Sequence, residues 1–256
     1  MVKTRQSLVI TFFLLVILTG SGCYVIEPEP GIVGCEPDPL PAGIVSRFQS
    51  VGRSVQGRQM MIEVLGDGTD VTLVMASIHG NEPAGTPLVH ALSDYLKANL
   101  DFLDGRTVVI MPVANPDGLA RGTRYNVHNV DLNRNFTASN RQNNAVNGLA
   151  ALSEPESRAI HHCIRDYQPD RIISLHQPLA CVDYDGPARS MALRMSRLCA
   201  LPIKKLGARP GSLGSYAGEI LDIPIITLEM RRTDSSLSAE QLWQQYGQAL
   251  LAGIGG

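Results

Sequence analysis

The sequence predicts an α/β fold, with a mixed, largely parallel sheet sandwiched between helices in a single domain. From residue 44 onward, apolar runs of strand length alternate with helical patterns, which is typical of a sheet covered by helices on both faces. The apolar runs are continuous, as expected for strands buried on both sides. The chain has 256 residues, of which 44% are hydrophobic. This length suffices for one large core but not for a second domain of similar size.

Four strands and four helices are expected along the chain. The expected strands are Val71–Ile78, Thr107–Val113, Arg171–His176 and Pro224–Met230. The expected helices are Pro87–Leu100, Glu154–Tyr167, Ala188–Leu201 and Ser238–Leu251. In an open sheet of this kind, ligands bind at the carboxyl ends of the strands, so functional side chains are expected there.

The N-terminus has the pattern of a secretory signal over residues 1–23. Lys3 and Arg5 precede an apolar run from Leu8 to Leu18, and small residues then lead to Cys23. The run is shorter than the roughly 20 residues of a membrane helix, which disfavours an uncleaved anchor. The small residues before Cys23 resemble the lipobox of bacterial lipoproteins, although position 20 is Gly where that motif usually has Leu. Export to the periplasm is therefore expected, with ordinary cleavage and lipid anchoring through Cys23 in the outer membrane as open alternatives.

Residues 24–43 contain five prolines among acidic residues and predict a stiff, extended tether. The expected catalytic domain then covers residues 44–256.

Apart from Cys23, the cysteines are Cys35, Cys163, Cys181 and Cys199, and both disulfides and buried free thiols stay open. The net charge of −2 and the lack of a basic patch in the sequence argue against a nucleic-acid partner, and contact with a membrane is expected only through a lipid anchor.

A metal site is indicated where two of the expected strands end. The stretch "SIHGNEP" places His79 and Glu82 just after the first strand, and "ISLHQP" ends another strand at His176. Two imidazoles and one carboxylate are the ligand set of many catalytic zinc sites, which leave the fourth position for water. The alternative is that His79 caps a loop and Glu82 is a solvated charge.

Two further stretches strengthen the metal interpretation. The stretch "ITLEM" drives Glu229 into the end of an apolar strand, where a charge is costly unless a nearby cation compensates it. The stretch "GTRYNVHNVDLNRNF" concentrates Arg124, Asn133 and Arg134, whose side chains are suited to binding carboxylates. The alternative is a solvated basic loop, or an ion pair between Arg134 and Asp131.

Taken together and in this order, these motifs resemble the zinc carboxypeptidase family. The set comprises the stretches at 79–82, 115–118, 124, 131–136, 174–176 and 227–229. Within that family, "SEPESRAI", "SLHQPLAC" and "RPGSLGSY" are most similar to the murein peptide amidases, which cut the γ-D-glutamyl–diaminopimelate bond of cell-wall peptides. The resemblance implies a zinc-dependent hydrolase with one zinc ion per chain and a peptidoglycan-derived peptide as substrate.

The resemblance also implies a role for each motif residue. The zinc ligands would be His79, Glu82 and His176. The general base would be Glu229, which can take a proton from water and return it to the leaving amine. The oxyanion would be stabilised by Arg124. The free carboxylate of the leaving residue would be held by Asn133 and Arg134.

Some positions depart from this pattern or stay open. Family members of the animal digestive type carry a mobile Tyr before the base, whereas this chain has none near Gly207, and Tyr216 is expected to pack against the sheet. Arg209 could contact a second substrate carboxylate or be an ordinary surface arginine. The remaining histidines, His90, His128, His161 and His162, are expected to be structural or solvated.

Two other functions are carried beside the murein peptide amidase. The first is a general zinc metallocarboxypeptidase that trims ordinary peptides. The second is an inactive protein that binds cell-wall peptides for a partner, which the presence of every expected ligand and of Glu229 disfavours.

Overall fold

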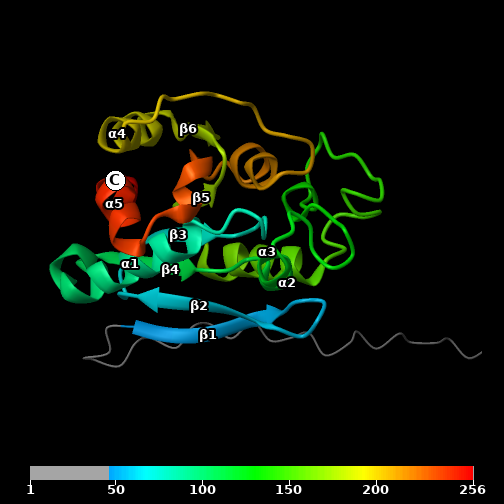
Figure 1. The fold of residues 1–256 in the computed structure, drawn as a ribbon, viewed down its shortest axis with the longest axis horizontal. Coiled ribbons are helices and arrows are strands. Elements are labelled where there is room, and N and C mark those ends of the chain that lie inside the picture. The colour runs from blue at the N-terminus through cyan, green and yellow to red at the C-terminus, as the bar shows by residue number, and fades with distance from the viewer. Residues whose placement is uncertain (1–45, 256) are drawn as a thin grey trace, which may run out of the picture. The chain divides into compact units, whose positions relative to one another are not determined.

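The computed structural model describes residues 46–255. The expected signal over 1–23, the tether over 24–43, Cys23 and Cys35 lie outside the described residues. The described chain forms one seven-stranded sheet with the order β1-β2-β4-β3-β5-β7-β6 (Figure 1). The strands are β1 (Ser46–Arg53), β2 (Gln59–Leu65), β3 (Asp70–Ala76), β4 (Arg106–Met111), β5 (Arg171–His176), β6 (Leu179–Asp185) and β7 (Ile225–Arg231).

The sheet is mixed, with a parallel centre and antiparallel edges. Strands β4, β3, β5 and β7 pair in parallel, whereas β1, β2 and β6 join antiparallel to their neighbours. This confirms the expected fold class, and the four expected strands are β3, β4, β5 and β7. Strand β3 ends two residues earlier than expected because Ser77 turns the backbone to φ 51°. The sequence analysis missed β1, β2 and β6, which carry polar residues among the apolar ones.

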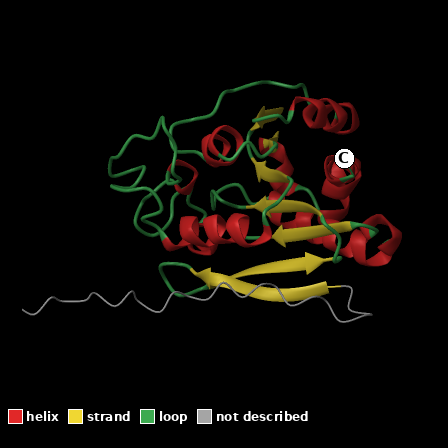
Figure 2. Cartoon of the chain, turned by 180° about the vertical axis from the view of Figure 1, so that it is seen from behind, coloured by secondary structure: helices red, strands yellow, loops and turns green. Residues whose placement is uncertain are grey.

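Helices cover both faces of the sheet (Figure 2). The α-helices are α1 (Gly85–Ala98), α2 (Pro116–Arg121), α3 (Pro155–Tyr167), α4 (Arg189–Cys199) and α5 (Ala239–Ile254). One core contains apolar residues of α1, α4 and α5, and the other contains residues of α3 and of a π-helix, η3 (Gly214–Ile220). The four expected helices correspond to α1, α3, α4 and α5. They begin and end within a few residues of the expected positions.

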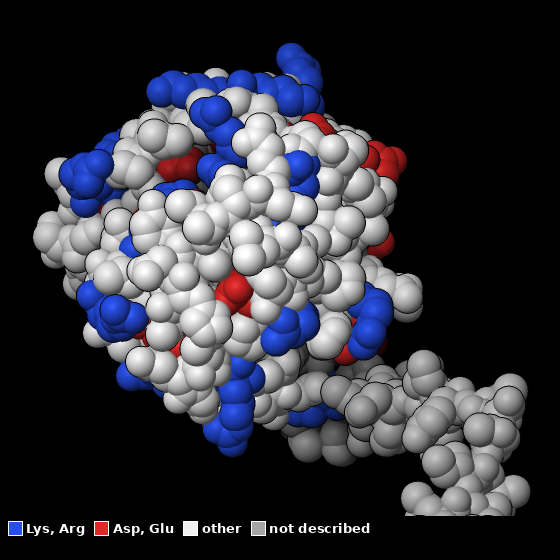
Figure 3. All heavy atoms as spheres, turned by 90° about the vertical axis from the view of Figure 1, so that its right-hand side faces the viewer, with Lys and Arg blue, Asp and Glu red and all other residues white. Residues whose placement is uncertain are grey.

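Charged side chains are spread over the visible surface. On the face shown in Figure 3, Lys and Arg are scattered among neutral residues and interrupted by acidic ones, in keeping with the near balance of charge in the sequence. No helix within residues 46–255 has the length and apolar character needed to cross a membrane. The thiols of Cys163, Cys181 and Cys199 are free and buried, as one of the two sequence interpretations expected.

Candidate metal centre and substrate pocket

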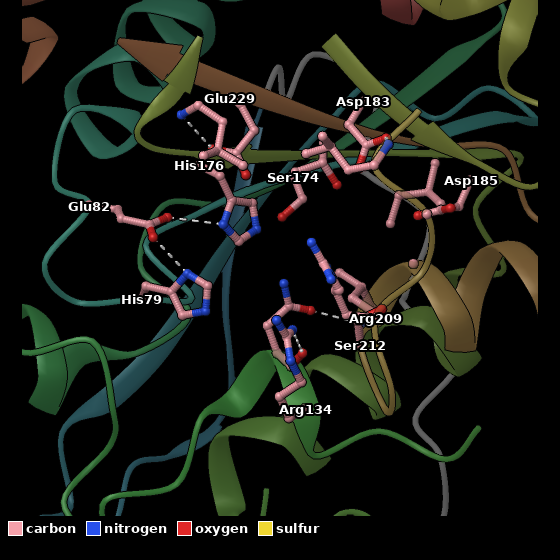
Figure 4. Close-up of a pocket in the computed structure, with 18 of the residues that line it drawn as sticks. His79, Glu82, Arg134, Ser174, His176, Asp183, Asp185, Arg209, Ser212 and Glu229 are labelled. Carbon is pink, nitrogen blue, oxygen red and sulfur yellow. Dashed lines mark hydrogen bonds and ion pairs between the residues drawn. The ribbon is translucent and has the colours of Figure 1, made fainter. Parts of the chain in front are cut away.

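The sheet brings the three expected metal ligands together. His79 and Glu82 lie in the loop that follows β3, and His176 is the last residue of the neighbouring parallel strand β5. One ligand atom from each of these side chains lies within 4.8 Å of the others. Figure 4 shows both imidazoles turned toward the Glu82 carboxylate. Two residues far apart in sequence meet here because parallel strands end at the same edge of the sheet.

The geometry fits a zinc ion. The Nδ1 atoms of His79 and His176 lie 2.9 Å and 3.0 Å from the two oxygens of Glu82. All three side chains are buried, with at most 6% of their surface exposed. A His₂Glu set with one open position is a known arrangement for catalytic zinc. Burial alone would raise the pKa of Glu82, but the hydrogen bonds from both imidazoles hold it below its usual value.

The loop that carries His79 and Glu82 is locked against the start of α2. A Cβ on Gly80 would lie 1.9 Å from the carbonyl carbon of Gly118, so only glycine allows the two backbones this approach. Asn115 caps α2 by accepting a hydrogen bond from the Gly118 N–H at 2.9 Å, and its own N–H donates to the Ser77 carbonyl at 2.9 Å. The "HGNE" and "NPDG" stretches are therefore one structural unit.

Asp131 is a site residue whose role the sequence analysis missed. One of its oxygens lies 3.1 Å from Nε2 of His79, on the side of the ring that faces away from Glu82, and the other accepts from Nε of Arg124 at 3.0 Å. It therefore fixes the orientation of the His79 ring. Among the described residues, Asp131 forms ion pairs with His79 and Arg124 and none with Arg134, so the alternative of an Arg134–Asp131 ion pair is wrong. Burial alone would raise the pKa of Asp131, but His79, Arg124 and Arg134 together hold it below its ordinary value.

Glu229 lies beside the metal site, at the position the sequence analysis gave it. In the parallel pairing of β5 and β7, Glu229 is the direct partner of His176. One oxygen accepts a hydrogen bond from the Leu179 N–H at 3.2 Å. Burial raises the pKa of the Glu229 carboxyl, and this outweighs the opposing effects of His176 and the Leu179 N–H.

One pocket of about 510 Å³ contains every expected site residue. Besides the metal ligands and Glu229, it is lined by Arg124, Asn133, Arg134 and Arg209. The Asn133 side-chain oxygen accepts from the Leu213 N–H at 2.8 Å, which holds the loop over 131–136 against the segment before η3. Burial lowers the pKa of Arg134, and the nearby positive charges of Arg124 and Arg209 lower it further. Three guanidinium groups thus line the pocket, and that of Arg124 also lies 3.4 Å from an oxygen of Glu82.

The same pocket also contains acidic residues that the sequence analysis missed. Asp183 and Asp185 of β6 line it opposite the metal ligands, together with Ser174 of β5 (Figure 4). In the stretch "VDYD", Val182 and Tyr184 pack against one core while the two aspartates point to the other side of the strand. This alternation was the signal that could have revealed both the strand and the acidic wall.

Tyr216 packs in the core as expected, and His128 and His161 are solvated or structural as expected. Tyr216 is buried, its ring stacks on Phe136 with centroids 5.8 Å apart, and its hydroxyl lies 2.8 Å from Nδ1 of His161. Among the described residues, no tyrosine lines the pocket. His128 is exposed and pairs with Glu154 at 2.8 Å. These residues support the loops around the pocket instead of entering it.

The fold and the site define a class of enzyme. The zinc carboxypeptidase family matches residues 43–184, and the chain belongs to that family. It is a zinc metallopeptidase, and the three clustered side chains of His79, Glu82 and His176 are its candidate metal site.

Individual relatives are similar over most of the chain. Murein peptide amidase A of Escherichia coli K12 is 33% identical over 187 residues, covering 66% of this chain and 74% of that protein. Murein peptide amidase A of Vibrio campbellii is 30% identical over 213 residues, covering 75% and 82%. The crystal structure of murein-tripeptide amidase MpaA from E. coli O157 superimposes with a TM-score of 0.64 at 25% identity, covering 82% of this chain and 97% of that one.

Proposed function

We propose that this protein hydrolyses an amide bond in peptidoglycan peptides, namely the γ-D-glutamyl–meso-diaminopimelate bond. One observation carries the proposal: a single pocket joins the metal ligands and Glu229 to a group of arginines that can bind carboxylates. The similarity to two murein peptide amidases supports the choice of substrate. A second pocket of about 270 Å³ shares Glu82 and Arg124 with the first, and we expect it to hold the part of the substrate on the other side of the scissile bond.

Each side chain has a part in this reaction. His79, Glu82 and His176 would hold the zinc ion, which supplies a water of lowered pKa and a polarised carbonyl when bound. Glu229 accepts the proton of the attacking water and passes it to the leaving amine. Arg124 stabilises the negative charge that develops on the carbonyl oxygen. Asn133 and Arg134 bind the free carboxylate of the leaving residue, which fixes the position of the scissile bond.

The direct test is digestion of purified muropeptides followed by mass spectrometry. We expect release of meso-diaminopimelate from L-alanyl-γ-D-glutamyl-meso-diaminopimelate, loss of this activity with a chelator, and its return with zinc. Ordinary peptides with a free C-terminus form the comparison arm. Cleavage of these peptides alone would show a general metallocarboxypeptidase, and no turnover of either class by the zinc-loaded protein would favour a binding protein.

Glu229→Gln tests the assigned base. Because the amide cannot carry the proton, kcat should fall by about 10²–10⁴-fold. Zinc content, measured by atomic absorption, should stay at one ion per chain. Turnover of this variant at the wild-type rate would remove Glu229 from the mechanism.

The proposed substrate lies outside the inner membrane, which agrees with the expected export signal. We propose that the chain is exported to the periplasm and anchored in the outer membrane through Cys23, on the strength of residues 1–23 alone. Mass spectrometry of the mature N-terminus decides this point. An acylated Cys23 supports anchoring, and an unmodified new N-terminus supports ordinary cleavage.

A further inference from the structure

Two carboxylates in the substrate pocket have no part in the reaction described above. Asp183 and Asp185 are buried, with 6% and 5% of their surface exposed, yet both line the pocket. Asp183 accepts hydrogen bonds from backbone N–H groups only, that of Leu206 at 2.8 Å and that of Tyr184. Within residues 46–255, the Asp185 carboxylate receives no hydrogen bond and forms no ion pair. A buried carboxylate without a partner is destabilising unless a bound cation compensates it.

The surrounding structure is shaped around Asp185. A Cβ on Gly214 of η3 would lie 2.2 Å from an Asp185 oxygen, and a Cβ on Gly218 would lie 2.8 Å from the Asp185 Cβ. Glycines at these two places let η3 press directly against the aspartate. The carboxylate is therefore confined between β6 and η3, with the pocket as its open side.

The charges near Asp185 do not neutralise it. The pKa of Asp185 is raised to about 6 by burial, by Asp183 on the same strand and by Glu219 on η3. Lys205, in the loop between α4 and η3, only partly opposes this rise. Burial also raises the pKa of Asp183. Two neighbouring carboxylates that are both disfavoured as anions form a site for a positive group supplied from outside.

A cationic residue lies close to these acids and is not paired with them. Arg209 lines the same pocket, and its charge acts on both Asp183 and Arg134. Its guanidinium forms no ion pair within the described part of the chain. Figure 4 shows Arg209 and Arg134 on one side of the pocket and the two aspartates on another. The far end of the pocket thus offers both a positive and a negative group.

The sheet register sets the depth of the acids relative to the base. In the pairing of β6 with β7, Asp183 is opposite Thr227 and Asp185 is opposite Ile225. These partners are two and four residues before Glu229, which corresponds to roughly 7 Å and 13 Å along the strand. The chain of six bonds from the scissile nitrogen of diaminopimelate to its distal amine spans roughly 7–8 Å when extended. The distal amine therefore reaches the level of Asp183, and Asp185 lies two residues further along the same face of β6.

We propose that Asp183, Asp185 and Arg209 form the site that recognises the side chain of the leaving residue, with its ammonium against the aspartates and its carboxylate against Arg209. The inference rests on the proposed function, since it concerns the residue which that reaction releases. It predicts that the enzyme selects a leaving residue whose side chain ends in both an amine and a carboxylate. Lysine has only the distal amine and would bind the aspartates but not Arg209. The compound 2-aminopimelate has only the distal carboxylate and would bind Arg209 but not the aspartates.

A binding experiment tests the site separately from catalysis. Calorimetric titration of the zinc-loaded wild type with free meso-diaminopimelate, lysine and 2-aminopimelate should give the tightest binding for the first. Asp185→Asn should weaken binding of meso-diaminopimelate and lysine by about 30-fold or more, because it leaves a buried ammonium without its charge partner. Binding of 2-aminopimelate should be unchanged. Asp183→Asn provides a second variant with the same expected pattern.

The matched control is Glu219→Gln. This residue is exposed on η3 and its charge acts on Asp185, but it does not line the pocket. Its replacement should leave all three affinities within about twofold of the wild type, as expected for an exposed charge.

Arg209→Gln should weaken the binding of meso-diaminopimelate and 2-aminopimelate and leave the binding of lysine unchanged. Equal losses for all three ligands in every variant would overturn the assignment.

Kinetic measurements separate failure of this inference from failure of the proposed function. If the wild type cleaves the γ-D-glutamyl substrate and Asp185→Asn lowers kcat/KM equally for the diaminopimelate and 2-aminopimelate forms, the recognition site is wrong and the amidase stands. If the wild type cleaves only ordinary peptides, the amidase is wrong. In that case, a preference for acetyl-alanyl-lysine over acetyl-alanyl-norleucine that is lost in Asp185→Asn would support the recognition site. The absence of this preference in the wild type would overturn it.

Discussion

At the scale of single residues, the metal site depends on side chains that hold other side chains in place. Asp131 contacts the His79 ring on the atom that does not face Glu82, so it selects which nitrogen is presented to the metal. Residues of this kind influence metal affinity nearly as much as the ligands themselves. The sequence motif contained Asp131, but nothing in the sequence indicated that it would meet His79, which is 52 residues away.

Asp131→Asn should therefore weaken zinc binding without removing a ligand. We expect zinc affinity to fall by about 10–100-fold, since the amide can hold the imidazole in the wrong tautomer. Competition with a fluorescent chelator measures the change. Activity at saturating zinc should recover much of its wild-type value, and a variant with unchanged zinc affinity would contradict the positioning role.

The unpaired Asp185 predicts a specific dependence of stability on pH. Its pKa is raised from 3.8 to about 6 in the folded protein, so the folded state keeps the proton over a range where the unfolded state has lost it. The free energy of unfolding therefore falls as the pH rises from about 4 to 6, by roughly 3 kcal/mol at most from this group.

Asp185→Asn should remove that part of the pH dependence. The variant should be more stable than the wild type at pH 7.5 and of similar stability at pH 4.5, as measured by urea denaturation of the metal-free proteins. Using metal-free protein for both excludes changes in zinc occupancy. A difference in stability that is the same at both pH values would count against an ionised, unpaired Asp185.

At the scale of secondary-structure elements, two short motifs act by contact between backbones. The loop after β3 presents two metal ligands because Gly80 lies directly on Gly118 at the start of α2. Asn115 completes the unit by bonding to both the strand end and the helix N-terminus. The loop is held by the helix, so the orientation of the ligands depends on the packing of α2.

Gly80→Ala should displace this loop. The added methyl group would overlap the Gly118 backbone, so we expect the free energy of unfolding to fall by about 1–3 kcal/mol together with a loss of zinc affinity. Gly122→Asn is the matched control, because it lies at the end of the same helix at φ 63° with no atom within 4 Å of its Cβ position, and Asn tolerates this conformation. Equal behaviour of the two variants would argue against the contact.

At the scale of the whole molecule, the site lies where the parallel centre of the sheet meets its antiparallel edge. Strands β3 and β5 deliver the metal ligands, β7 delivers Glu229, and β6 adds the acidic wall. The two cores on either side of the sheet keep these strands in register. Metal binding therefore links two segments of the chain that are almost 100 residues apart.

Zinc should accordingly stabilise the folded protein. At a zinc concentration about 100 times the dissociation constant, binding contributes about 2.7 kcal/mol, which corresponds to roughly 5–10 °C in Tm for a protein of this size. Differential scanning fluorimetry with and without a chelator measures the shift. Glu229→Gln should keep the full shift and His176→Ala should lose most of it, whereas a shift that survives in His176→Ala would indicate another zinc site.

The sequence by itself determined the fold class, the central strands and the chemical type of the metal site. Continuous apolar runs that alternate with helical patterns are typical of strands buried between helices, and "HGNE", "SLH" and "TLE" mark the ends of such runs. The edge strands, the contact between Asp131 and His79, and the acidic wall of the pocket were decided only by the tertiary structure. They depend on pairing between distant strands and on the close approach of η3 to β6. The only local signal among them was the alternation of Val182 and Tyr184 with the two aspartates, which does not show what the aspartates would face. Asp183 and Asp185 look like solvated charges until β7 and η3 enclose them.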